Sequence, residues 1–278
     1  MKGYMQIEYM KKSSTVFGWD NNDFQALLKS CKNDEAIKIT LEYLNNKNIK
    51  ILEAGCGLGR VVKYLNDLGY KNVSGIEINK DSVNFLNNNY PELNIIYGDI
   101  LDLKYKDNSF DVVLSYGVVE HFYDGPDKPL KSLYNVLCSG GIAIITVPSF
   151  NKLRKIKYYL RFLDFRKYNF IRRIFKKNLL NKNKSNLGYF IEPEYGKFFE
   201  YRFTKKQFED ICKNAGFEIV KSLPIAHVDG FYHEVSKNLV KFNNWEFKIS
   251  IVSNFLNNFF KKIPFFHNHM HMCILKKN

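Results

Sequence analysis

The feature that most constrains the fold is a glycine-rich turn at residues 55–59, which separates a short apolar run from a segment with helical spacing. The run 51–54 reads Ile-Leu-Glu-Ala, the turn reads Gly-Cys-Gly-Leu-Gly, and the helical segment begins at Arg60. Glycine lets the backbone approach a ligand closely, and the first turn of a helix offers free N–H groups to an anion. The order strand, glycine turn, helix therefore predicts a ligand-binding edge in an α/β protein.

Strand-like and helix-like segments alternate from residue 49 to residue 148, which is typical of a mostly parallel sheet covered by helices on both faces. The predicted strands are 49–52, 73–78, 94–97, 110–114 and 142–147, and the predicted helices are 60–68, 81–89 and 130–137. A helix that Thr204 opens with a capping box, a strand at 217–223 and a closing strand at 269–275 follow later. We expect an α/β fold with a doubly wound, mostly parallel, seven-stranded sheet.

Two insertions interrupt this pattern, so we expect one sheet domain in three regions. These are 1–148, with N-terminal helices and the ligand-binding half; 149–200, a basic aromatic insertion; and 201–278, the rest of the same domain, with an apolar helical insertion at about 225–266. Apolar spacing predicts one helix over 23–46 and another over 247–263.

The positive charge is concentrated in the first insertion. The chain carries a net charge of +14, and residues 152–184 hold thirteen Lys and Arg against the single acid Asp164. Five of the seven arginines lie there: Arg154, Arg161, Arg166, Arg172 and Arg173. Leucine and isoleucine between them make the pattern basic and amphipathic. We expect an anionic membrane surface or a phosphate-bearing acceptor to dock on this segment, with RNA and a solvated lid as open alternatives.

Polar residues also follow the ends of the predicted strands. Glu77 ends the second strand, 18 residues after Gly59, where a carboxylate can accept both hydroxyls of a ribose. Asp99 follows the third strand, and the run 115–122 follows the fourth. Because the carboxyl ends of parallel strands meet at one edge, these residues and the glycine turn predict one ligand site.

The glycine spacing separates two classes of cofactor. The dinucleotide fingerprint G-x-G-x-x-G would need a glycine at position 60, where this chain has Arg60. The glycines fall instead at alternate positions, and Glu53 lies two residues before the first of them. This disfavours a nicotinamide cofactor.

Together these motifs resemble those of the class I S-adenosylmethionine-dependent methyltransferases, with the nearest likeness to the small-molecule and quinone O-methyltransferase branch. The likeness rests on Glu-Ala-Gly-Cys-Gly-Leu-Gly at 53–59, Glu77, Gly-Asp-Ile at 98–100, Val-Val-Glu-His-Phe at 118–122, Tyr-Arg-Phe-Thr at 201–204 and Ala-Gly-Phe at 215–217. It covers about 49–148 and 200–223, and it covers neither insertion.

The resemblance implies S-adenosyl-L-methionine as the cofactor and gives each matching residue a role. Glu53, Gly55 and Gly57 would surround the methionine end of the cofactor, and Gly59 would let helix and strand pack closely. Glu77 would hold the ribose, Ile78 and Ile100 would flank the adenine, and Asp99 would bind the adenine amino group. Ser115 and Tyr116 would border the sulfonium. His121 has the pKa range of a general base and would deprotonate the acceptor; a structural place within its motif is the alternative. Glu120 is expected to be structural or solvated.

The expected function is methyl transfer to a small-molecule, lipid-linked or glycan acceptor, with oxygen favoured by the likeness. An RNA-directed methyltransferase is the alternative, because the basic insertion could hold a phosphate backbone. Base-amino methylation commonly uses Asp/Asn-Pro-Pro-Tyr where residues 115–118 read Ser-Tyr-Gly-Val, and no cysteine follows a proline as cytosine C5 chemistry requires. Nucleic acid is therefore the less favoured partner.

The sequence also bears on metal binding and on location. His267, His269 and His271 alternate and would share one face of a strand, but no carboxylate partner is evident, so no metal site is expected. The five cysteines form no Cys-x-x-Cys pair, which argues against a zinc ribbon or a disulfide framework. Neither a signal sequence nor an apolar window of about 18 residues is present. We expect a cytoplasmic protein, with peripheral association at the inner membrane face and the oligomeric state left open.

Overall fold

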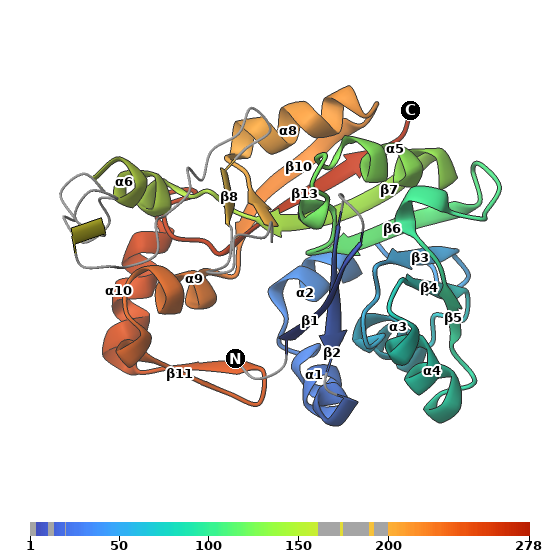
Figure 1. The fold of residues 1–278 in the computed structure, drawn as a ribbon, viewed down its shortest axis with the longest axis horizontal. Helices are drawn as coiled ribbons and strands as arrows, with labels where there is room; N and C mark the ends of the chain where they lie inside the picture. The colour runs from blue at the N-terminus through green and yellow to red at the C-terminus, as the bar shows by residue number, and fades with distance from the viewer. Residues whose placement is uncertain (1–3, 11–13, 20, 161–172, 175–188, 192–199) are drawn as a thin grey trace.

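A seven-stranded sheet forms the centre of the molecule (Figure 1). The structure, a computed structural model, describes residues 4–10, 14–19, 21–160, 173–174, 189–191 and 200–278. The sheet has the order β10-β13-β7-β6-β3-β4-β5. Its strands are β3 (Ile51–Ala54), β4 (Val73–Glu77), β5 (Asn94–Tyr97), β6 (Phe110–Tyr116), β7 (Leu137–Pro148), β10 (Glu218–Ile225) and β13 (Met270–Lys276). Only β13 runs antiparallel to its neighbours β7 and β10, which confirms the predicted mostly parallel sheet.

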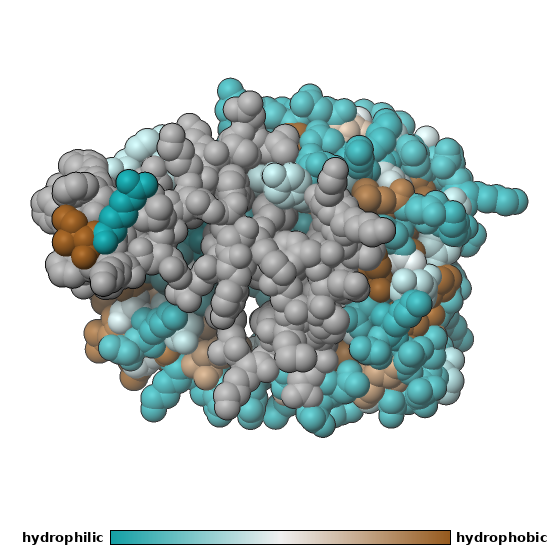
Figure 2. Space-filling view, viewed as in Figure 1, coloured by the Kyte–Doolittle hydropathy of each residue, from teal (hydrophilic) through white to brown (hydrophobic). Residues whose placement is uncertain are grey.

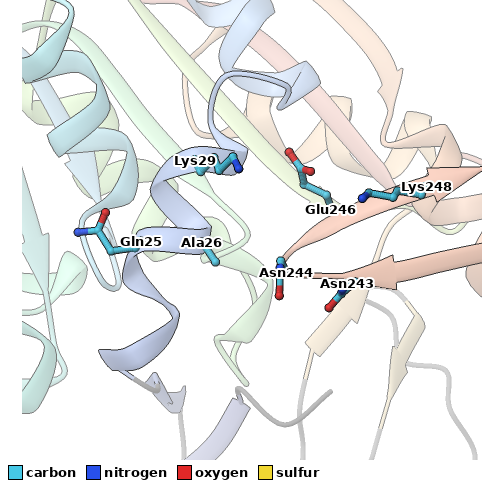
Figure 3. Close-up of a pocket in the computed structure, with 7 residues that line it drawn as sticks. All are labelled: Gln25, Ala26, Lys29, Asn243, Asn244, Glu246 and Lys248. Atoms are coloured by element: carbon cyan, nitrogen blue, oxygen red, sulfur yellow. The ribbon is translucent and has the colours of Figure 1, made fainter.

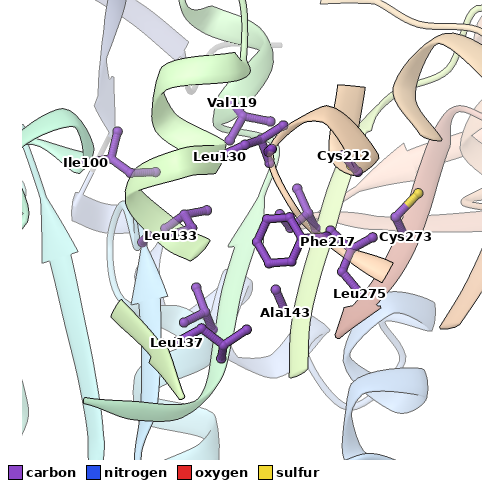
Figure 4. Close-up of a cluster of buried hydrophobic side chains, with 14 of the residues drawn as sticks. Ile100, Val119, Leu130, Leu133, Leu137, Ala143, Cys212, Phe217, Cys273 and Leu275 are labelled. Carbon is purple, nitrogen blue, oxygen red and sulfur yellow. The ribbon is translucent and has the colours of Figure 1, made fainter. Parts of the chain in front are cut away.

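Helices cover both faces of the sheet, as the alternating pattern predicts. One face packs against α5 (Asp127–Val136) and α8 (Lys205–Asn214), and the other against α3 (Arg60–Asp67) and α4 (Lys80–Asn89). Side chains alternate between the faces along a strand, so Val113 joins the first core while Val112 and Leu114 join the second. Figure 4 shows the first core, where helical leucines of α5 meet Phe217 and Leu275.

The N-terminal region differs from the prediction of one helix over 23–46. Two helices form, α1 (Phe24–Ser30) and α2 (Glu35–Leu41), because the Asp34 side chain accepts hydrogen bonds from the Ala36 and Ile37 N–H groups and begins a new helix. A short 3₁₀ turn, η1 (Asn21–Asp23), precedes them. The hairpin of β1 (Tyr4–Met10) and β2 (Ser14–Trp19) was not predicted.

The predicted capping box at Thr204 is confirmed. The Gln207 N–H donates to Thr204 Oγ1 at 3.3 Å, and the Thr204 N–H donates to Gln207 Oε1 at 3.0 Å. Before α8 come β8 (Tyr189–Ile191) and β9 (Glu200–Arg202), which pair with each other, and α6 (Lys152–Leu160), the described helix of the basic insertion.

The second insertion contains a hairpin where a helix was predicted. After α9 (His227–Glu234) and η6 (Lys237–Leu239), the strands β11 (Val240–Asn243) and β12 (Glu246–Ile249) pair, and α10 (Ile251–Lys261) follows. Phe247 pairs with Phe242 across the hairpin, so the predicted helix 247–263 starts too early. The Ser250 side chain accepts from the Ser253 N–H and fixes the true start of α10. Within the described residues, no helix combines the length and apolar character needed to span a bilayer.

Candidate cofactor and acceptor site

The glycine turn after β3 requires glycine at each of its alternate positions. Gly55, Gly57 and Gly59 have φ values of 78°, 56° and 68°, in the left-handed region that side chains disfavour. A Cβ atom on Gly55 would also lie 2.6 Å from a methyl carbon of Val118, in the loop after β6. The turn and this loop therefore pack directly against each other at the carboxyl edge of the sheet.

Glu77 lies at the end of β4 and contacts the glycine turn. The sequence predicts both at the same edge of the sheet. Glu77 Oε2 accepts from the Gly57 N–H and its Oε1 from the Asn79 N–H, both at 2.8 Å. Burial raises the pKa of Glu77, and these backbone hydrogen bonds oppose the rise. Each carboxylate oxygen keeps acceptor capacity beyond one N–H bond, so the side chain can still receive the hydroxyls of a ribose.

Glu53 is a buried acid with an unsatisfied oxygen. It is 4% exposed, and its Oε2 has no hydrogen-bond partner among the described residues. Burial raises the pKa of Glu53 to about 8, although Arg60, which is paired with Asp34 at 2.9 Å, opposes the rise. A buried carboxyl group without a partner is costly unless something supplies a donor. The ammonium group of a bound amino acid would fit this position.

The end of β5 lies beside the end of β4, because the Gly98 N–H donates to the Glu77 carbonyl at 3.0 Å. Asp99 caps the short helix η2 (Ile100–Asp102) by accepting from the Leu101 N–H at 2.8 Å, so it also serves as the turn residue of this loop. Ile78 is partly exposed, whereas Ile100 is buried in the first core.

Ser115 and Tyr116 at the end of β6 differ in their surroundings. Ser115 is fully buried, and its hydroxyl has no partner among the described residues. The Tyr116 hydroxyl shares a hydrogen bond with the Thr40 hydroxyl on α2, and burial raises the pKa of Tyr116. This contact fixes α2 over the end of β6.

His121 and Glu120 lie on η3 (Val119–His121), in the loop that touches the glycine turn. His121 Nε2 lies 3.8 Å from Glu120 Oε1. Glu120 is 1% exposed, so the solvated interpretation of this residue is wrong. Burial raises the pKa of Glu120 well above its ordinary value, which favours the neutral acid beside the histidine.

Arg154 is not available to an anionic surface, contrary to the prediction for the arginine cluster. It is 5% exposed; its Nε donates to Glu234 Oε1 at 2.6 Å, its Nη1 to the Ser149 carbonyl at 2.5 Å and its Nη2 lies 3.0 Å from His269 Nδ1. The charge pattern of the sequence could not reveal this buried ion pair, because the partner Glu234 lies far along the chain on α9. Arg173 is exposed, and the other three arginines lie outside the described residues.

The alternating histidines near the C-terminus do not act as a group. His267 Nε2 pairs with Asn257 Oδ1 at 2.8 Å, and His271 Nε2 pairs with Ser222 Oγ at 2.7 Å. His269 instead faces Asp229 and His233 of α9. The sequence analysis missed these two residues, although a spacing of four residues places both on one face of a helix.

A separate pocket lies between α1 and the β11–β12 hairpin (Figure 3). It measures about 310 Å³ and is lined by Gln25, Ala26, Lys29, Asn243, Asn244, Glu246 and Lys248. It contains none of the residues predicted to bind the cofactor, so the candidate site rests on the geometry of the sheet edge.

Comparison with known proteins agrees with this geometry. Residues 52–145 match a family model described as a methyltransferase domain. The chain is 30% identical over 99 residues to a protein of Mycolicibacterium smegmatis named a probable S-adenosylmethionine-dependent methyltransferase, covering 36% of this chain and 38% of that protein. It is 33% identical over 100 residues to a fatty-acid O-methyltransferase of the same species, covering 35% and 36%. The chain thus matches less than two fifths of the length of these two relatives.

A solved structure extends the likeness to most of the fold. The PH0226 protein from Pyrococcus horikoshii OT3 aligns with a TM-score of 0.55 and 16% identity, over 88% of this chain and 89% of that one. At 16% identity, this match supports a similar fold and says nothing about function. The matched methyltransferase domain, the sheet order and the glycine turn together identify the part of the chain around residues 52–145 as a class I S-adenosylmethionine-dependent methyltransferase domain.

Proposed function

We propose that this protein transfers a methyl group from S-adenosylmethionine to an oxygen atom of a small acceptor, and that the acceptor is a lipid or lipid-linked molecule rather than a free glycan. The observation that carries the methyltransferase assignment is the contact between the Gly57 N–H and the Glu77 carboxylate. This contact brings the backbone of the glycine turn and an acid suited to a ribose into one site at the sheet edge.

The residues at this edge fit the cofactor of the family. Glu77 would accept the ribose hydroxyls, the free oxygen of Glu53 would receive the ammonium group, and Asp99 would bind the adenine amino group. When bound, S-adenosylmethionine supplies an electrophilic methyl group. The task of the chain is then to hold the acceptor atom in line, within about 3–3.5 Å of that methyl group.

His121 is proposed as the general base for a hydroxyl acceptor, because it lies in the loop that contacts the glycine turn. Replacing His121 with Gln should lower turnover by about tenfold while cofactor affinity stays unchanged, since solvent can still remove the proton slowly. Turnover and S-adenosylhomocysteine affinity should be measured on the same preparation. Turnover equal to the wild type would leave His121 with a structural role.

The lipid assignment is supported by an apolar end of the molecule, made by Ile156, Tyr159 and Leu160 of α6 and by Ile251, Val252, Phe255 and Phe259 of α10. Ile251 is 91% exposed, and Val252 and Phe255 are each 72% exposed. Hydrogen bonds from the Lys152 and Leu153 N–H groups to the carbonyls of Phe265 and Phe266 join α6 to the segment after α10. Figure 1 shows both helices at the same end, and Figure 2 shows hydrophobic residues over α10.

Such a surface is unusual on a protein exposed only to water. The spacing of Ile251, Phe255 and Phe259 places them on one face of α10, and Lys261 and Lys262 follow at its end. Apolar side chains flanked by lysines are typical of a helix that lies in the interface of an anionic membrane. We propose that the apolar end rests on anionic lipid and receives the acceptor from it.

Replacing Phe255 and Phe259 with Asp should abolish sedimentation with anionic vesicles, because each loses roughly 1.5–3 kcal/mol of apolar burial. Cofactor binding should not change. Leu68→Asp is the matched control, because Leu68 is 40% exposed but lies at the end of α3. Wild-type protein that ignores anionic vesicles would contradict the membrane proposal, and salt-sensitive binding to RNA instead would favour the nucleic-acid alternative.

The activity itself can be tested without knowing the acceptor. The full chain is incubated with S-adenosylmethionine carrying an isotopic label in its methyl group, together with a cell extract that is then divided into lipid, aqueous and RNA fractions. We expect the label in the lipid fraction, on a molecule heavier by one methylene unit. Label only in the aqueous or RNA fraction would contradict the lipid acceptor, and absence of transfer to any fraction would contradict the activity.

A further inference from the structure

Three side chains with metal-binding groups converge outside the proposed cofactor site. Asp229 and His233 lie one turn apart on α9, and His269 lies just before β13. Asp229 Oδ1 is 3.2 Å from His233 Nε2 and 3.8 Å from His269 Nδ1. One potential ligand atom from each of the three residues lies within 4.8 Å of the other two.

The fold brings these residues together at the sheet edge that holds the glycine turn. Because β10 is antiparallel to β13, the end of β10 and the start of β13 lie side by side. The His269 N–H donates to the Ala226 carbonyl at 3.2 Å, and the His269 carbonyl accepts from the Ser149 N–H at 2.9 Å. The positions of α9 and His269 are thus fixed by backbone contacts, independently of their side chains.

The shared carboxylate oxygen lacks a partner. Asp229 Oδ1 is shielded from solvent and makes no hydrogen bond to the described residues, although two ring nitrogens lie nearby. Buried polar atoms normally have a partner, so this oxygen calls for one.

We propose that Asp229, His233 and His269 bind one divalent transition-metal ion of the class represented by Zn²⁺ and Co²⁺. Ligand atoms about 2.0–2.2 Å from such an ion lie roughly 3–4 Å apart, which the two Asp229 distances already match. Imidazole with carboxylate is a ligand set that these ions accept. Three protein ligands leave a coordination position open to an oxygen atom of another molecule.

Arg154 is the competitor for this site. Its Nη2 lies 3.0 Å from His269 Nδ1, the same nitrogen that faces Asp229. Metal binding requires Arg154 to give up this contact. Its guanidinium would keep the bonds to Glu234 and to the Ser149 carbonyl, and Glu234 compensates its charge.

The test is a titration of the full chain, freed of metal with a chelator that is then removed, with Co²⁺ followed by absorption and with Zn²⁺ followed by calorimetry. We expect one equivalent of each ion to bind and Zn²⁺ to raise the unfolding temperature. Asp229→Asn, which preserves side-chain volume, and His269→Gln should each lose the Co²⁺ absorption band and the thermal shift. His121→Gln is the matched control and should retain both.

Two results would overturn the site. One is a wild-type chain that binds neither ion, a result that does not depend on whether any variant folds. The other is unchanged binding in both Asp229→Asn and His269→Gln. None of these measurements requires S-adenosylmethionine or an acceptor, so the metal site and the proposed methyl transfer can fail separately.

Discussion

Replacing Glu77 with Ala should weaken binding of S-adenosylhomocysteine by roughly 10- to 100-fold, the effect expected when hydrogen bonds to a charged group are lost. The substitution removes the proposed acceptor of the ribose hydroxyls. It also leaves the Gly57 and Asn79 N–H groups without the carboxylate that now binds them. The glycine turn would then lose its link to β4. Calorimetry on the full chain measures the effect directly.

Asp102→Ala is the control for this prediction. Asp102 lies on η2, three residues beyond Asp99, and its carboxylate pairs with the exposed Lys104 at the surface. Its loss should leave the affinity unchanged, whereas Asp99→Ala should produce a smaller loss than Glu77→Ala. Equal affinity in wild type, Glu77→Ala and Asp99→Ala would show that the cofactor does not bind at this edge.

Replacing Gly230 with Ala should destabilise the protein by about 3 kcal/mol, at the upper end of the usual cost of overpacking. A Cβ atom on Gly230 would lie 1.7 Å from the His267 carbonyl oxygen and 2.8 Å from the His269 nitrogen. Both are backbone atoms, so they cannot rotate away. The helix α9 would have to move away from the segment before β13, and Asp229 and His233 on this helix would then move away from His269.

The direction of the change in the free energy of unfolding distinguishes close packing at Gly230 from an ordinary helix position. Gly230 lies inside α9, where alanine in place of glycine ordinarily stabilises a helix by roughly 0.5–1 kcal/mol. Chemical denaturation measures the free energy of unfolding for the wild type and for Gly230→Ala. A variant as stable as the wild type, or more stable, would contradict the close packing of α9 against residues 267–269.

The central sheet could be predicted from the sequence because its signals are local. Short apolar runs, the glycine turn and strand-end acids each occupy a few consecutive residues, and the site at the edge follows from the direction of parallel strands. The contact between Gly57 and Glu77 is therefore the part of the site that the sequence analysis anticipated most closely. The unsatisfied oxygen of Glu53 could not be predicted, since it depends on what packs around it.

The errors arose where a pattern could not reveal a partner. The apolar period across 23–46 continues through Asp34, although this residue caps a second helix. Phe247 fits a helical stripe but pairs with Phe242 in a hairpin whose turn, Asn244 and Trp245, has positive φ. Charge alone assigned Arg154 to the surface, whereas Glu234, which is 80 residues away, holds it inside.

The candidate metal cluster shows the same limit. Asp229 and His233 form a local signal, but His269 joins them only because β10 and β13 pair antiparallel and end together. Long-range pairing of this kind leaves no periodic pattern in the chain. The sequence therefore predicts the apolar character of the insertion before the last strand. It does not predict which residues of this insertion lie at the sheet edge.

The most direct test of the account is a calorimetric titration of the purified full chain with S-adenosylhomocysteine and, separately, with NAD⁺. The glycine spacing, with Arg60 where a dinucleotide fold needs glycine, and the Glu77 contact predict saturable binding of one S-adenosylhomocysteine per chain and no binding of NAD⁺. Binding of NAD⁺, or failure to bind S-adenosylhomocysteine by a folded chain, would contradict it.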